Sequence, residues 1–108
     1  TWEEYHADVM RVAKALLALG CTQHGAVNVL AWNSPEWYFA AVGAIFSGMT
    51  PAGIYTTNSP EAVEYILNHS KSQVIFVDSD PQLQKVLAVR GACPHLKAIV
   101  HWGPDCPA

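Results

Sequence analysis

Asn33-Ser34-Pro35-Glu36 is a four-residue stretch that returns later in the chain as Asn58-Ser59-Pro60-Glu61. Each copy follows an apolar run and precedes a run with helical spacing. Serine is a preferred N-cap, and proline suits the first helical position because its missing N–H would have no partner there. Glutamate in the first turn lies near the positive end of the helix dipole. The repeat therefore predicts two junctions at which a strand is followed by a helix, and Asp80-Pro81 predicts a third.

The runs between these junctions predict the order of the elements. The chain opens with Thr1 and Glu4 at capping-box spacing, and an amphipathic helix follows that ends at Gly20 and covers one face of a sheet. Strands are predicted at 27–32, 50–55, 73–77 and 98–102, and helices at 35–47, at 60–71 and from 80 onward. Strands joined by connections of helix length predict an α/β fold: an open parallel sheet with right-handed crossovers and helices on both faces.

The composition limits the classes of protein to which the chain can belong. The chain has 108 residues, of which 51% are hydrophobic and 14% charged, which suits one small packed domain. The formal net charge is −3 and no run of Lys or Arg occurs, which argues against nucleic-acid binding. The apolar stretch 37–48 is too short to span a membrane. Three cysteines without CxxC spacing indicate a reducing compartment, and five scattered histidines have no metal-ligand spacing.

The predicted helix 35–47 is apolar nearly all round its circumference. Such a helix is buried on most sides, which a free domain of this size could hardly achieve. We therefore expect residues 1–108 to be the α/β portion of a longer protein, whose remainder covers this helix.

No catalytic signature is present: the chain lacks a GxSxG elbow, an HExxH pair, a Rossmann GxGxxG and a Walker A loop. What remains is the loop Tyr55-Thr56-Thr57-Asn58-Ser59, which offers hydroxyls, an amide and an aromatic ring before a helix N-terminus. Helix N-termini attract anions, so the loop could hold a phosphate or a nucleotide. From the residues alone, a simple capping role for Ser59 is the more common outcome, because caps are ubiquitous and anion sites are few.

Three segments carry a resemblance to a family. They are Asn33-Ser34-Pro35-Glu36-Trp37, the run 43–48, and the run 53–61, and Gln82-Leu83-Gln84-Lys85 and Pro94-His95-Leu96-Lys97-Ala98 add to them. Together they resemble the amino-terminal region of the adenylate-forming acyl-CoA synthetases, and within these the long-chain, bubblegum-type fatty acyl-CoA synthetases. Ser47-Gly48-Met49 stands where the family usually has Ala-Gly-Gly, and Thr56 and Thr57 stand where some relatives have glycines.

The resemblance implies a two-step ligase. The full enzyme would join a long-chain fatty acid to ATP with Mg²⁺, release pyrophosphate, and then pass the acyl group to CoA. The family's phosphate loop, adenine-binding motif and catalytic lysine would lie downstream, so we expect the 108-residue chain to be inactive alone. The resemblance also implies that Tyr55, Thr56, Thr57 and Asn58 lie near the CoA nucleotide, and that Lys85 meets its phosphates.

Two other hypotheses stay open at this point. The chain could be a non-enzymatic, flavodoxin-like binding or regulatory domain, or a member of the same superfamily that acts on another carboxylic acid. For a long-chain fatty acyl-CoA synthetase we expect a cytoplasmic protein, with a peripheral contact with the endoplasmic reticulum membrane as a further option.

Overall fold

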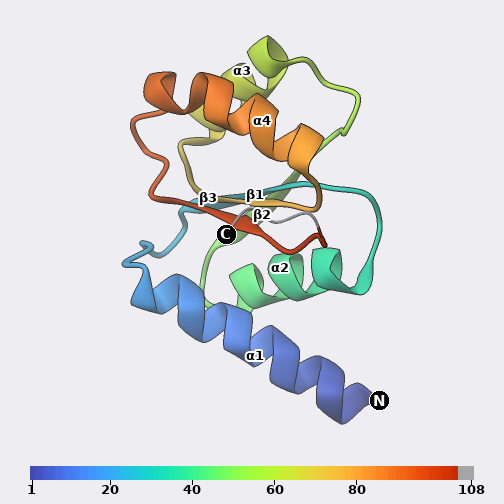
Figure 1. Cartoon of the computed structure of the whole chain (residues 1–108). Helices are drawn as coiled ribbons and strands as arrows, with labels where there is room; N and C mark the ends of the chain where they lie inside the picture. Colours follow the sequence, from blue (N-terminus) through green and yellow to red (C-terminus); the bar gives the residue numbers. More distant parts are fainter. Residues whose placement is uncertain (105–108) are drawn as a thin grey trace.

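The computed structural model describes residues 1–104, which form a four-stranded parallel sheet with helices on both faces (Figure 1). In chain order the elements are α1 (Trp2–Ala18), β1 (Ala26–Leu30), α2 (Pro35–Phe46), β2 (Thr50–Ile54), α3 (Pro60–Ser70), β3 (Ser72–Val77), α4 (Asp80–Val89), a 3₁₀ turn (Arg90–Ala92) and β4 (Ala98–His101). The predicted fold class, strand positions and parallel pairing are confirmed, with strand ends that differ by at most two residues.

The strand order is β2-β1-β3-β4, so β1 lies inside the sheet between β2 and β3. The helices α3 and α4 cover one face, and α2 and α1 lie on the other (Figure 1). The helix that follows β1 therefore lies on the opposite face from the helices that follow β2 and β3. Loops that leave neighbouring strands in opposite directions open a crevice at the carboxyl edge of a sheet.

The first helix is predicted to cover one face of the sheet, and the structure confirms this only in part. α1 packs mainly against α2, and its carboxyl half reaches the core below the sheet through Leu16. The close approach depends on Gly43 of α2, where a Cβ atom would lie 2.7 Å from Cγ1 of Val12. The predicted end at Gly20 is confirmed: this residue has φ 79°, and the N–H of Cys21 reaches back to the carbonyl of Leu16.

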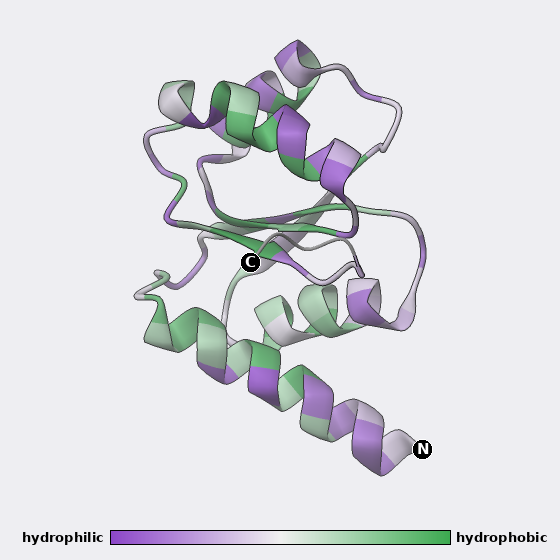
Figure 2. Ribbon diagram, in the orientation of Figure 1, coloured by the Kyte–Doolittle hydropathy of each residue, from purple (hydrophilic) through white to green (hydrophobic). Residues whose placement is uncertain are grey.

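The helix α2 is apolar along most of its length, as Figure 2 shows by its green shades. Its small residues Ala40, Gly43 and Ala44 are buried, whereas Tyr38, Ile45 and Phe46 are exposed. A single helix cannot turn all its apolar side chains to one sheet, so part of its apolar surface stays open among the residues that the structure describes.

Candidate functional site

The carboxyl edge of the sheet carries a crevice of about 460 Å³ between the loops that follow β1 and β2. It is lined by Ala31, Trp32, Asn33, Trp37, Gly53, Ile54, Tyr55 and Thr56. Trp32 and Tyr55 are 69% and 82% exposed, so two aromatic residues flank the opening. Exposed aromatic faces of this kind can stack on the base of a nucleotide.

The predicted loop is a tight turn at this edge. The N–H of Asn58 donates to the carbonyl of Tyr55 at 3.1 Å, so Thr56 and Thr57 form the corner of the turn. Thr57 is exposed, and Thr56 is half-buried. Tyr55 and Thr57 are thus exposed on the turn, whereas Thr56 lies nearer to the fold.

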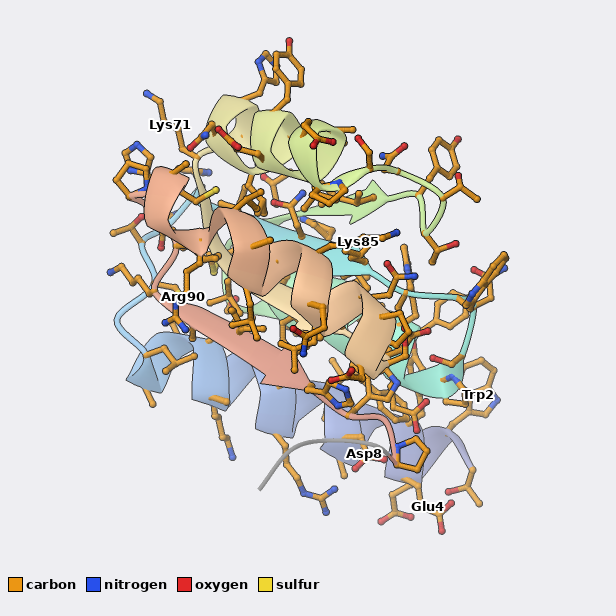
Figure 3. The ribbon with its side chains drawn as sticks, turned by 45° about the horizontal axis from the view of Figure 1, so that its top comes forward. Trp2, Glu4, Asp8, Lys71, Lys85 and Arg90 are labelled. Carbon is orange, nitrogen blue, oxygen red and sulfur yellow. The ribbon has the colours of Figure 1, made fainter. Side chains whose placement is uncertain are left out.

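The structure brings Lys85 to the same loop. Its Nζ lies 2.7 Å from the carbonyl oxygen of Thr56, and Figure 3 shows the side chain reaching from α4 toward the loop after β2. Lys71, in contrast, points outward from the end of α3 (Figure 3). An ammonium group has three donors, so a hydrogen bond to one carbonyl leaves Lys85 able to bind an anion as well.

The caps of α2 and α3 act as the sequence predicts. The hydroxyl of Ser34 accepts from the N–H of Trp37, and that of Ser59 accepts from the N–H of Ala62, each at 3.3 Å. The pKa of Glu61 is lowered by a hydrogen bond from its own backbone N–H and by a second from the hydroxyl of Ser59. The hydroxyl of Ser59 and the carboxylate of Glu61 therefore already interact with the N-terminus of α3, so the binding of an anion at this edge would depend on Lys85.

Three further residues, which the sequence did not indicate, hold this edge together. Asp78 accepts from the backbone N–H of Trp32 at 2.9 Å, which links the loop after β1 to the end of β3. Gln82 on α4 lies 3.4 Å from the carbonyl oxygen of Thr56. Trp32 is the last residue of the predicted strand 27–32 and Asp78 directly follows the predicted strand 73–77, and this position at strand ends was the signal that could have found them.

Other features of the described part of the chain bear on cofactors. Within residues 1–104, no three His, Cys, Asp or Glu side chains gather closely enough to hold a metal ion. No helix in the same range is both long and apolar enough to cross a membrane.

A family model for AMP-binding enzymes matches residues 1–107. The chain belongs to the AMP-binding enzyme family. This membership agrees with the resemblance seen in the residues and with the α/β fold.

Known proteins resemble the chain over almost its whole length. It is 46% identical over 105 residues to the long-chain-fatty-acid–CoA ligase ACSBG1 of Bos taurus, and 38% identical over 102 residues to ACSBG2 of Homo sapiens. These alignments cover 93% and 94% of the chain, but the chain spans only 14% and 15% of the length of those relatives.

Solved structures share the fold. The anthranilate CoA ligase AuaEII in complex with anthranoyl-AMP has a TM-score of 0.90 and 29% identity, over 94% of this chain and 20% of that one. The N-terminal domain of FACL13 from Mycobacterium tuberculosis has a TM-score of 0.87 and 26% identity, over 94% of this chain and 26% of that one. Both matches support the parallel α/β architecture as a part of larger proteins.

Proposed function

We propose that residues 1–108 are the amino-terminal α/β portion of the AMP-binding domain of an ATP-dependent long-chain fatty acid–CoA ligase. The intact protein would form an acyl-adenylate from the fatty acid and ATP, release pyrophosphate, and then transfer the acyl group to the thiol of CoA with release of AMP. The observation that carries this proposal is the 46% identity, over 93% of the chain, to a protein named as a long-chain-fatty-acid–CoA ligase. The proposal assigns Mg²⁺ and the catalytic residues to the remainder of the polypeptide.

In that reaction this chain would border the CoA nucleotide, through Tyr55, Thr56, Thr57, Asn58 and Lys85. The crevice supports this role because it lies at the carboxyl edge of a parallel sheet, where α/β proteins bind ligands. The exposed ring of Tyr55 offers a surface on which the adenine base can stack. The ammonium group of Lys85 offers the positive charge that the phosphates of CoA require.

The experiment compares Thr57→Ala and Lys85→Ala in the intact protein with a matched control, Lys71→Ala. The control removes the same charge from an exposed position at the far end of α3. We expect both loop substitutions to raise the KM for CoA several-fold, because a single hydrogen bond contributes about 1 kcal/mol net. Adenylate formation, measured by ATP–pyrophosphate exchange, should be almost unchanged. Unchanged KM values for CoA, or equal damage to adenylation, would reject the assignment.

The same assay tests the role of the fragment. The 108-residue chain should give background ATP–pyrophosphate exchange with a long-chain fatty acid, because the proposal assigns the catalytic groups to the rest of the polypeptide. Measurable turnover by the chain alone would contradict this part of the proposal.

A second candidate keeps the enzyme class and changes the acid. The likeness to an anthranilate CoA ligase, at 29% identity, favours this candidate over a non-enzymatic flavodoxin-like domain. Adenylation by the intact protein with long-chain fatty acids and with aryl acids, side by side, distinguishes the two substrates. A preference for the aryl acid would replace the fatty acid in our proposal.

For its location we propose the cytoplasm, with a peripheral contact with the endoplasmic reticulum membrane. The thiols of Cys21 and Cys93 support a reducing compartment, because neither is in a disulfide. Fractionation tests the proposal: the protein should be recovered in the cytosol or be released from the membrane fraction by salt or carbonate. Retention in the membrane after carbonate washing would oppose it.

A further inference from the structure

The carbonyl oxygen of Thr56 lies within reach of two side chains from α4. Nζ of Lys85 lies 2.7 Å from it, and Nε2 of Gln82 lies 3.4 Å from it. Gln82 and Lys85 are three positions apart in one helix, so they project from the same face of α4. A helix that follows β3 therefore holds the corner of a turn that follows β2, across a separation of 26 and 29 residues in sequence.

The environment of Gln82 is unusual for a glutamine that serves only the fold. Its side chain is buried, with 8% of the residue exposed, and its Oε1 has no hydrogen-bond partner among the described residues. A buried amide with an unpaired acceptor lowers stability, and an apolar side chain of similar shape avoids this cost. Packing therefore does not account for a glutamine at this position, whereas the contact with Thr56 does.

We propose that Gln82 is a positioning residue for the CoA-binding turn and acts through the carbonyl of Thr56. With two donors on that oxygen, the turn 55–58 is held in the conformation that presents Tyr55 and Thr57 to the ligand. Because Gln82 also donates to this carbonyl, the ammonium group of Lys85 can donate to a phosphate without leaving the carbonyl unpaired. The role in CoA binding rests on the proposed function, whereas the restraint on the turn does not.

The test uses the intact protein with Gln82→Met, which keeps the length of the side chain and removes both polar atoms. The matched control is Gln84→Met on the same helix, where the amide is exposed and lies 3.2 Å from Asp80 instead of the loop. Hydrogen exchange at the N–H of Asn58, which closes the turn, reports on the restraint without any catalysis. The KM for CoA and the rate of ATP–pyrophosphate exchange then separate thioester transfer from adenylation.

For Gln82→Met we expect exchange at Asn58 to be several-fold faster, the KM for CoA to be several-fold higher, and adenylation to be unchanged. The melting temperature should be equal to that of the wild type or higher, a result that a merely structural glutamine would not give. For Gln84→Met all four measurements should match the wild type.

A second variant, Gln82→Glu, tests the same contact by charge. The introduced carboxylate repels the carbonyl of Thr56 and attracts the ammonium group of Lys85 three positions away. We expect a larger rise in the KM for CoA than with methionine, and a smaller one as the pH falls and the carboxylate is protonated.

Unchanged exchange at Asn58 in Gln82→Met would overturn the proposal. So would a lower melting temperature with faster exchange throughout the sheet, since Gln82 would then serve the whole fold. Faster exchange with an unchanged KM in an active enzyme would overturn its role in CoA binding. If the wild-type protein forms no acyl-CoA, the proposed function fails, and exchange at Asn58 still decides whether Gln82 restrains the turn.

Discussion

Oγ of Ser70 lies 3.1 Å from Oδ1 of Asn28, a hydrogen bond between the last turn of α3 and the inner strand β1. Asn28 is fully buried, and its Nδ2 donates to the carbonyl of Ala52 on β2 at 3.2 Å. The side chain of Asn28 thus connects β1 to β2, which precedes the loop of the candidate site, and to α3, which follows that loop.

Asn28→Ala should destabilise the sheet because it removes the hydrogen bonds to the Ser70 hydroxyl and to the Ala52 carbonyl, while Ser70 keeps its bond to the Ile66 carbonyl. We expect a loss of about 1–3 kcal/mol, since each of the two lost hydrogen bonds contributes roughly 0.5–1.5 kcal/mol. The measurement is native-state hydrogen exchange of the β1 amides in the intact protein. A loss of stability no larger than that of an ordinary surface substitution would mean that water replaces the asparagine side chain without cost.

Gly43→Ala should separate α1 from α2. The added methyl group would lie 2.7 Å from Cγ1 and 2.8 Å from Cβ of Val12, and 3.1 Å from the carbonyl of Val9. Overpacking of this kind costs about 1–3 kcal/mol, to be measured by unfolding of the intact protein in urea. Gly91→Ala is the control, because a Cβ there meets nothing within 4 Å. Equal stability of the two variants would contradict the close helix contact.

The open apolar side of α2 should be covered in the intact protein. Ile45 is 59% exposed within residues 1–104, so Ile45→Ser would be nearly neutral if solvent stayed there in the whole molecule. We expect instead a loss of about 1.5–3 kcal/mol in urea unfolding, the value for a buried aliphatic side chain. Leu87→Ser on α4, where the leucine is 44% exposed, is the control. A neutral Ile45→Ser would show that solvent remains on this side of α2.

Ser59→Ala should weaken the start of α3 and raise the pKa of Glu61. The pKa of this carboxyl is lowered first by its own backbone N–H and then by the Ser59 hydroxyl, so loss of the hydroxyl moves it back toward the ordinary value. Because the folded state lowers the pKa, its stabilising effect is present above the ordinary pKa and is lost as the pH falls through the folded value. The pH dependence of the carboxyl ¹³C shift of Glu61 in segmentally labelled protein measures the change.

The cap itself should add a cost of about 1 kcal/mol for Ser59→Ala, visible as faster hydrogen exchange in the first turn of α3. Ser79→Ala, read out as exchange in the first turn of α4, is the control, since Ser79 makes no side-chain cap bond there and its hydroxyl donates to Asp78 instead. If both substitutions cost the same, the Ser59 hydroxyl does not act as a cap.

Local sequence patterns were enough to predict the elements and their order. Ser34 and Ser59 before proline predict helix starts whatever lies around them, because capping needs only atoms within one turn. Gly20 ends α1 for a similar local reason, its positive φ. Alternation of these elements with apolar strands was enough to predict a parallel sheet with helices on both faces.

Contacts between residues that are distant in sequence depend on the three-dimensional fold and could not be predicted. The strand order β2-β1-β3-β4 places the corner at Thr56 beside Lys85 and Gln82, and no local pattern joins residues that far apart. α1 lies mainly on α2 because Gly43 permits a contact closer than any side chain would allow, which apolar periodicity does not reveal. Spacing along the chain predicts which face of an element is buried, but the partner of that face depends on packing and connection over the whole fold.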